Sequence, residues 1–184
     1  DVAERILAAG QADLCAMTRG MVADPDLPNK ARDNRLDDIR TCIACNQACI
    51  GHIHKSTSIS CIQYPESGRE LSYGTLVPAK KKKRVTVVGG GPAGLKAAAI
   101  AAARGHEATL YEREAQLGGQ VRLAEKLPGR MEFGGLVENL AHEANRAGAR
   151  IVKGVAADAA LIRNENPGAI ILATGAQPRA PELP

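Results

Sequence analysis

The chain has 184 residues, enough for one or two domains with hydrophobic cores, and its formal net charge is only +4. Basic residues are spread through the chain apart from a run at Lys80–Arg84, and three Tyr, one Phe and no Trp are available to stack on bases. We therefore expect no nucleic-acid partner. No apolar stretch approaches the length of a membrane span, so we expect no membrane partner either.

The first forty residues carry the pattern of a parallel α/β unit. An amphipathic helix is predicted over 2–10, followed by a buried strand over 12–18 in which Cys15 lies among apolar neighbours. A loop over 18–28 and a short polar helix over 29–35 come next. One such unit cannot cover both faces of its strand, so we expect the end of a larger α/β domain and a chain that is a piece of a longer enzyme.

Four cysteines follow with the spacing C-x2-C-x3-C-x11-C, namely Cys42, Cys45, Cys49 and Cys61. In a C-x2-C pair both thiolates can converge on one metal centre, and four thiolates suit either tetrahedral zinc or an iron–sulfur cluster. Zinc sites usually combine two separate C-x2-C pairs. Three crowded cysteines and a remote fourth favour a cubane cluster instead, because its corners need ligands from several directions. Zinc stays open as the alternative.

Disulfide bonds are a weaker interpretation of these cysteines. No apolar export segment opens the sequence, and clustered cysteines in a cytoplasmic protein favour metal or redox chemistry, so we expect a cytoplasmic location. His52 and His54 lie inside the cysteine segment, but with four thiolates available we expect both on a loop surface. We assign no function to Cys15.

The second half of the chain alternates strands and helices. We expect Lys80–Arg84 to be a solvated linker that leads into a short β-branched strand ending at Val88. An alanine-rich helix follows to about Arg104, and a second strand then ends in Glu112. A later strand is predicted over 169–179. This alternation predicts a parallel α/β fold.

The turn after the first of these strands contains the three glycines of G-x-G-x-x-G, Gly89, Gly91 and Gly94. The first permits a tight turn, the second lets a pyrophosphate approach the backbone, and the third lets helix and strand pack closely. The helix N-terminus offers unpaired amides and a positive dipole to the phosphates. Glu112 is placed to accept hydrogen bonds from an adenosine ribose, and its negative charge argues against a 2′-phosphate. The alternative is a structural turn without a ligand.

Several motifs together resemble one flavoenzyme family. They are RGMVADPDLPNKARDNRLDDIRTCIACNQACI, CIQYPESGRE, VVGGGPAGLKAA, the LGGQ turn and the ATG turn before QPR. These resemble the family of 2,4-dienoyl-CoA reductase, trimethylamine dehydrogenase and N-methyl amine demethylases, over essentially the whole chain. One departure is Arg19-Gly20, where the family usually has Arg-Pro.

The resemblance implies an α/β fold class in three parts. Residues 1–40 would be the C-terminal end of an FMN-binding (β/α)8 barrel, residues 41–78 a cysteine-rich iron–sulfur cluster segment, and residues 79–184 an incomplete Rossmann-like FAD-binding domain. The substrate-binding barrel residues would lie upstream and an NAD(P)H-binding insertion downstream. No catalytic residue can therefore be named in this chain.

The resemblance also implies site residues. Cys42, Cys45, Cys49 and Cys61 would ligate a [4Fe–4S] cluster, and Thr18 and Arg19 would contact the FMN phosphate, although a surface salt bridge is the alternative for Arg19. The residues matched to the FAD or ADP site are Gly89, Gly91, Pro92, Ala93, Gly94, Glu112, Arg113, Gly118, Gly119, Gln120, Val155, Ala173, Thr174 and Gly175.

The function expected from these parts is electron transfer in a flavoprotein oxidoreductase. Electrons would pass between NAD(P)H or FAD and FMN through the cluster, to or from an unsaturated or N-methyl amine small-molecule substrate. The resemblance also implies FAD rather than ADP, because the Gly119-Gln120 turn faces the flavin side in family members that use FAD. The rival hypothesis is a zinc-stabilised dinucleotide-binding module without catalysis of its own.

Overall fold

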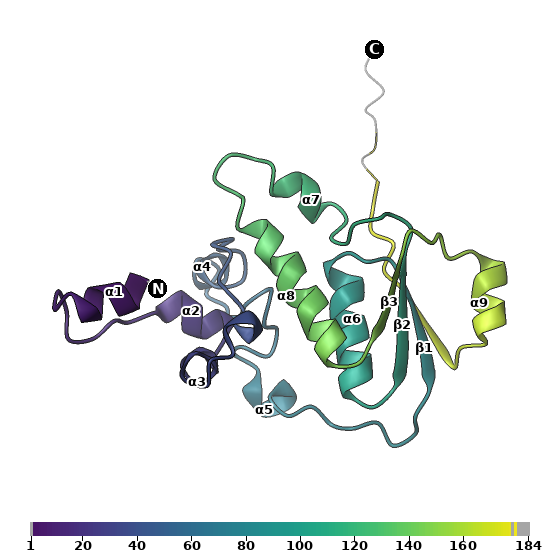
Figure 1. Ribbon diagram of the computed structural model, residues 1–184, viewed down its shortest axis with the longest axis horizontal. Helices are drawn as coiled ribbons and strands as arrows, with labels where there is room; N and C mark the ends of the chain where they lie inside the picture. Colours follow the sequence, from purple (N-terminus) through teal and green to yellow (C-terminus); the bar gives the residue numbers. More distant parts are fainter. Residues whose placement is uncertain (1, 178, 180–184) are drawn as a thin grey trace, which may run out of the picture.

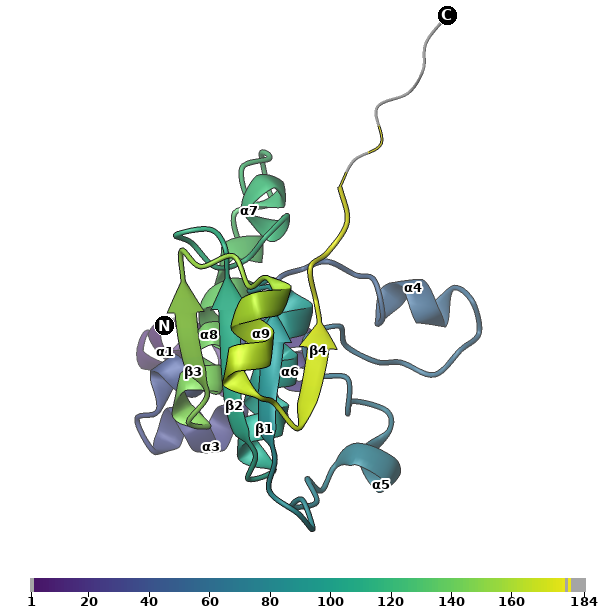
Figure 2. The same cartoon turned by 90° about the vertical axis from the view of Figure 1, so that its right-hand side faces the viewer.

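A four-stranded parallel sheet organises the second half of the chain, and this computed structural model describes residues 2–177 and 179 (Figure 1). Its strands are β1 (Arg84–Val88), β2 (Glu107–Glu112), β3 (Arg150–Lys153) and β4 (Ala169–Leu172). They lie in the order β3-β2-β1-β4, as Figure 2 shows face on. The register aligns Val87 of β1 with Leu110 of β2 and Ile171 of β4. The predicted parallel α/β fold is therefore confirmed.

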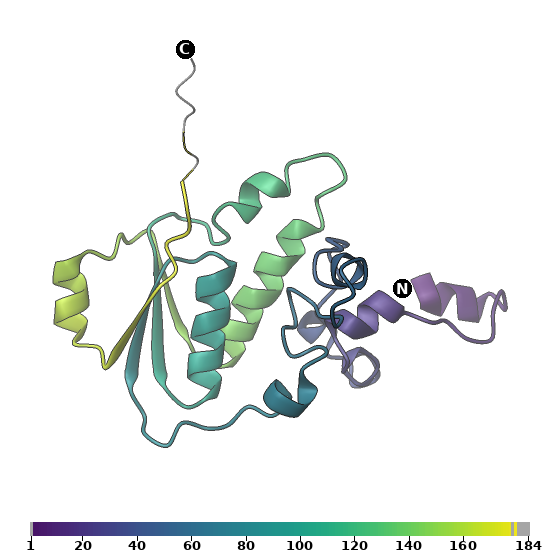
Figure 3. The same cartoon turned by 180° about the vertical axis from the view of Figure 1, so that it is seen from behind.

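Helices cover both faces of this sheet. The helices α6 (Pro92–Ala103) and α8 (Phe133–Arg146) lie on one face, and α9 (Ala159–Glu165) lies on the other (Figures 1 and 3). Asp158 caps α9, since its carboxylate accepts the N–H of Leu161 at 2.8 Å. Tyr111 of β2 donates to Glu165 of α9 at 2.8 Å, and burial first and this contact second raise the pKa of Tyr111. The tyrosine therefore stays neutral and fastens α9 to the sheet.

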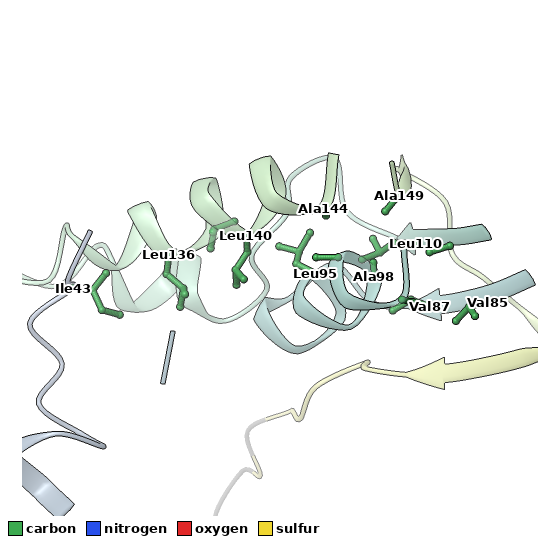
Figure 4. Close-up of a cluster of buried hydrophobic side chains, with 14 residues drawn as sticks. Ile43, Val85, Val87, Leu95, Ala98, Leu110, Leu136, Leu140, Ala144 and Ala149 are labelled. Carbon is green, nitrogen blue, oxygen red and sulfur yellow. The ribbon is translucent and has the colours of Figure 1, made fainter. Parts of the chain in front are cut away.

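The core lies between the sheet and the pair α6 and α8. Val87, Leu95 and Leu110 are completely buried there (Figure 4). The buried face of α6 consists mainly of glycine and alanine, so the helix backbone can approach the strands closely. The amphipathic helix α8 contributes Leu136, Val137, Leu140 and Ala144 from one face.

Short helices make up the first half of the chain. They are α1 (Val2–Ala8), α2 (Thr18–Ala23), α3 (Leu27–Arg32), a 3-10 turn at Leu36–Asp38, α4 (Ile50–Ile53) and α5 (Glu70–Tyr73), and a further short helix, α7 (Val121–Ala124), precedes α8. This part lies beside α8, on the side away from the sheet (Figure 1). None of the helices in the described part of the chain is long and apolar enough to cross a membrane.

Two predictions for the N-terminal segment were wrong. Residues 12–17 form no strand, and Leu14 is 88% exposed. The cause is that no other strand of the described residues lies beside this segment, so its backbone has nothing to pair with. Cys15 is half-buried rather than buried, and the predicted loop over 18–28 contains the helix α2. The end of a barrel over residues 1–40 stays a prediction.

Two other boundaries differ from prediction. The polar helix expected over 29–35 is α3, Leu27–Arg32, and the strand expected over 169–179 ends at Leu172. Pro178, within that predicted strand, and residues 180–184 of the predicted FAD-binding domain lie outside the described residues. The linker at Lys80–Arg84 is exposed, as expected.

Buried and bridging charges hold the N-terminal segment in place. Asp24 is 2% exposed, and its carboxylate accepts the Lys30 ammonium at 2.6 Å and the Arg40 backbone N–H at 2.8 Å. Asp38 bridges to α8 through His142 at 2.7 Å and through Arg146. The hydrogen bond from His142 is the main cause that lowers the pKa of Asp38. The charge pairs of Asp24 hold the segment together, and those of Asp38 dock it on α8.

Candidate functional site

The three glycines of the turn after β1 have different physical roles. Gly89 has φ +110°, and a Cβ there would lie 2.3 Å from the carbonyl oxygen of Ala173. A Cβ on Gly94 would lie 1.9 Å from the carbonyl oxygen of Gly89. A Cβ on Gly91 would meet nothing within 4 Å. The first and third glycines are therefore required by the fold, whereas the second faces open space that a ligand can use.

Helix α6 begins at this open space. Gly91 is its N-cap residue and makes no side-chain cap hydrogen bond, and Pro92 occupies the first turn. The unpaired N–H groups and the positive end of the helix dipole therefore face the space in front of Gly91, where they favour an anion such as a pyrophosphate.

Glu112 ends β2 with a buried and organised carboxylate. It is 7% exposed, and its two oxygens accept the N–H groups of Gly90 at 2.6 Å and Glu114 at 2.8 Å. The backbone N–H of Val155 donates to the Glu112 carbonyl oxygen at 2.9 Å, so Val155 lies beside this position after β3. The carboxylate is held in one orientation at the carboxyl edge of the sheet, where parallel α/β folds bind their ligands.

Most of the predicted dinucleotide residues line one cleft of about 710 Å³ at this edge, which we call the dinucleotide cleft. The predicted residues that line it are Gly89, Gly91, Pro92, Ala93, Glu112, Arg113, Gly119, Gln120, Ala173, Thr174 and Gly175. Sequence reasoning missed other wall residues, namely Glu114, Val121, Leu123, Ala176 and Gln177. Their position next to predicted motif residues was the only signal for them.

Three predicted residues of this set, Gly94, Gly118 and Val155, do not line the cleft, whereas Gln120 lines it and also joins two of its walls. Gly118 has φ +114°, and a Cβ there would lie 2.9 Å from Val137, so this glycine lets the turn pack on α8. The exposed side chain of Gln120 donates to the Ala176 carbonyl oxygen and ties the turn after β2 to the segment after β4. Gly94 lies beneath the cleft and Val155 beside it.

The four predicted cysteine ligands line one small cavity, the cysteine cavity, of about 20 Å³. All four are free thiols and half-buried. Ala44 and Asn46 in this segment have left-handed backbones, with φ of 51° and 55°. Left-handed alanine is uncommon and costs about 1–2 kcal/mol, so the surrounding structure must stabilise this loop shape.

Four thiolates are the ligand set of either tetrahedral zinc or an iron–sulfur cluster. Within residues 2–177 and 179, no three His, Cys, Asp or Glu side chains gather closely enough to hold one metal ion. Zinc needs its four sulfurs about 2.3 Å from one point, whereas a cubane separates its ligands over its corners. His52, half-buried in α4, contacts the Ser58 carbonyl oxygen through Nδ1 at 2.9 Å, and His54 is exposed. Neither histidine lines the cysteine cavity.

The two residues predicted at the FMN phosphate lie near the cysteines. Thr18 begins α2 and is exposed. Arg19 lines the cysteine cavity and donates to the Asn46 side chain at 3.2 Å. Arg19 forms no salt bridge within the described residues, so the alternative role considered for it is not observed there. Contact with FMN stays a prediction.

A third hollow, the bridging pocket, borders both sites. It measures about 550 Å³ and is lined mostly by apolar side chains. It shares Pro92, Ala93, Gln120 and Val121 with the dinucleotide cleft, and it shares Ile43, Ile62 and Gln63 with the cysteine cavity. The cysteine segment and the dinucleotide domain therefore meet across one apolar space, which no sequence motif indicated.

Comparison with known proteins agrees with this geometry. Residues 83–184 match the family model of pyridine nucleotide-disulphide oxidoreductases. The chain belongs to this family. NADH oxidase of Thermoanaerobacter brockii is 44% identical over 184 residues, which are all of this chain and 28% of that protein.

Two solved structures are similar over nearly the whole chain. One is 2-naphthoyl-CoA reductase in complex with 2-naphthoyl-CoA, with 36% identity, a TM-score of 0.94 and coverage of 100% of this chain and 28% of the other. The second is histamine dehydrogenase from Rhizobium sp. 4-9, with 30% identity, a TM-score of 0.92 and coverage of 98% and 27%. The chain thus spans between a quarter and a third of the length of these relatives.

These relatives confirm the family resemblance predicted from the motifs. Further relatives are named as reductases, dehydrogenases and a probable N-methylproline demethylase. The assignment of the chain to flavin-dependent oxidoreductases is confirmed at this level. The two similar solved structures extend over the cysteine segment as well as the dinucleotide domain, so the two parts occur together in those proteins.

Proposed function

We propose that this chain is the electron-transfer portion of an iron–sulfur flavoprotein, in which FAD occupies the dinucleotide cleft and a [4Fe–4S] cluster is held by Cys42, Cys45, Cys49 and Cys61. The observation that carries the proposal is the bridging pocket, because its walls belong both to the cleft and to the cysteine cavity. A redox ring bound there would lie between the two sites.

The residues of the cleft have distinct tasks in this proposal. Gly91 and the free amides of α6 bind the pyrophosphate, and Glu112 accepts the ribose hydroxyl groups. The apolar walls of the bridging pocket exclude water from the bound ring. A bound flavin can accept or give electrons in pairs or one at a time, whereas a cluster transfers them one at a time. A flavin beside a cluster can therefore take up an electron pair and pass it on as two single electrons.

For the whole protein we propose a flavin-dependent oxidoreductase that uses NAD(P)H, FMN and an unsaturated or N-methyl amine small-molecule substrate. The support is that relatives are named for reduction of naphthoyl-CoA and cinnamate and for oxidation of methylated amines. Residues 1–40, with Thr18 and Arg19, would belong to the FMN-binding part, residues 41–78 to the cluster segment and residues 79–184 to the FAD-binding domain.

The test is anaerobic purification of the full-length protein followed by metal, sulfide and flavin analysis. We expect iron and acid-labile sulfide in the ratio of a [4Fe–4S] cluster, broad visible absorbance that dithionite bleaches, and FAD released by acid. A colourless protein with one zinc ion per chain would support the zinc-stabilised module instead. Release of ADP or NAD instead of FAD would show that the cleft does not bind a flavin.

A further inference from the structure

Gln63 is a buried amide with an unused acceptor. The residue is 3% exposed, and its Nε2 donates to the Thr41 carbonyl oxygen at 2.9 Å. Its Oε1 is buried and has no hydrogen-bond partner among the described residues. The contact with Thr41 fixes which end of the amide is nitrogen, since the reverse orientation would bring two oxygens together. An unpaired buried carbonyl oxygen is costly, so a ligand donor is expected next to it.

The bridging pocket can supply this donor. Gln63 lines both the cysteine cavity and this pocket. On the cysteine side the groups available to a bound centre are thiolates and sulfides, which accept hydrogen bonds and do not donate them. The bridging pocket shares the wall residues Pro92, Ala93 and Gln120 with the dinucleotide cleft, and its volume of about 550 Å³ lies within the range of small-molecule sites.

The shape and polarity of the pocket match a flavin ring. Phe133, Leu136 and Leu140 supply an apolar wall, and Lys96 supplies a cation that also pairs with Glu143 at 2.8 Å. The pyrimidine edge of an isoalloxazine presents one N–H donor, at N3, between two carbonyl oxygens. An acceptor at Gln63 and a donor at Lys96 complement that edge.

We propose that Gln63 is a flavin-binding residue, whose Oε1 accepts a hydrogen bond from the N3–H of an isoalloxazine ring seated in the bridging pocket. This inference rests on the proposed function, because it requires FAD in the dinucleotide cleft. It goes further in assigning a residue of the cysteine segment, outside the dinucleotide-binding domain, to recognition of the flavin. The same side chain then contacts the flavin on one side and borders the cysteine cavity on the other.

The test compares FAD with ADP in the full-length protein depleted of flavin. ADP has the adenine, ribose and pyrophosphate groups of FAD but lacks the isoalloxazine ring. Gln63→Met keeps the side-chain volume and removes the acceptor. We expect it to weaken FAD binding about two- to tenfold, the range for one net hydrogen bond, and to leave ADP binding unchanged. Gln116→Met, the same change on an exposed loop, should alter neither affinity.

A second variant separates the acceptor from the contact with Thr41. Gln63→Glu removes the donor to Thr41 but keeps an oxygen acceptor, so it should retain FAD affinity better than Gln63→Met. With FAD labelled with ¹⁵N at N3, the N3 proton should exchange with solvent faster in Gln63→Met than in the wild type.

The outcomes are distinguishable. Equal losses of FAD and ADP binding would make Gln63 a structural residue, and unchanged FAD binding would mean that water satisfies its oxygen. Either result overturns this inference and leaves the proposed function standing. A wild-type protein that binds FAD no better than ADP would overturn the proposed function itself.

Discussion

The open space in front of Gly91 makes Gly91→Ala the most direct test of the dinucleotide cleft. Gly91 has φ −75° and ψ 177°, an extended backbone that alanine adopts readily, and a Cβ there meets nothing within 4 Å. The folding cost is therefore small. At an N-cap, Gly stabilises a helix by about 0.5–1.5 kcal/mol more than Ala does, and a Gly→Ala change at a compatible backbone conformation gains about 0.4–1 kcal/mol. We expect the free energy of unfolding to change by less than about 1 kcal/mol.

Binding should change much more than stability. The added methyl group occupies the space through which phosphate oxygens approach the amides of α6, and each charge-assisted hydrogen bond lost costs about 1.5–3 kcal/mol. ADP affinity should therefore fall by at least about tenfold, measured by calorimetric titration with urea unfolding in parallel. Wild-type ADP affinity in a folded Gly91→Ala protein would refute the assignment of the pyrophosphate to this turn.

Gly94→Ala provides the matched contrast. Its Cβ would lie 1.9 Å from the Gly89 carbonyl oxygen and 3.3 Å from the Ala173 Cβ, and both are parts of the rigid strand ends. Helix α6 would have to move away from the sheet, so we expect a loss of at least about 1–3 kcal/mol in unfolding free energy. Similar stability of the two variants would contradict the division between a ligand-facing and a packing glycine.

Three further predictions concern single side chains. Glu112→Gln replaces one of two acceptor oxygens by a donor, so stability should fall by about 1–3 kcal/mol and ADP affinity about tenfold, as unfolding and titration will show. Cys61→Ser should lower the iron and sulfide content of anaerobically purified protein, whereas Cys15→Ser, outside the cysteine cavity, should not. Asp38→Asn should cost about 1 kcal/mol above pH 4, because its hydrogen bond from His142 lowers the pKa of Asp38 in the folded state. The difference in unfolding free energy between Asp38→Asn and the wild type should shrink as the pH falls through the lowered pKa of Asp38. Urea unfolding from pH 7 to pH 2 measures it.

The dinucleotide half was predictable because its signals are local. A β-branched strand, a glycine turn and an alanine-rich helix lie next to one another in the chain, and the strands that pair with β1 lie within the same segment. The positions of Gly89, Gly94 and Glu112 follow from that local order. The geometry agrees with the roles expected of the glycines, and Glu112 stands at the expected strand end.

The N-terminal part was less predictable because its pattern depends on distant partners. The apolar segment over 12–17 can form a strand only if neighbouring strands pair with it. The described residues contain no strand beside it. The bridging pocket could not be predicted for a related reason. Gln63, Pro92 and Phe133 come from three separate segments, and only the folded chain brings them to one space.

The cysteine segment and the dinucleotide domain are coupled energetically through Ile43. Residues 39–46 form no helix or strand, and left-handed Ala44 costs about 1–2 kcal/mol, whereas Asn46 adopts this conformation more readily. Ile43 is 4% exposed and packs at the end of the core beside Leu136 (Figure 4), which contributes about 1.5–3 kcal/mol.

In the proposed function, the bonds of the thiolates to a bound cluster would add to the contacts that order this segment. Loss of that cluster would release Ile43, which is also a wall of the bridging pocket. Under that proposal, a ligand in the bridging pocket and a cluster at the cysteines would stabilise each other through Ile43, and by linkage each would raise the affinity of the other by the same factor.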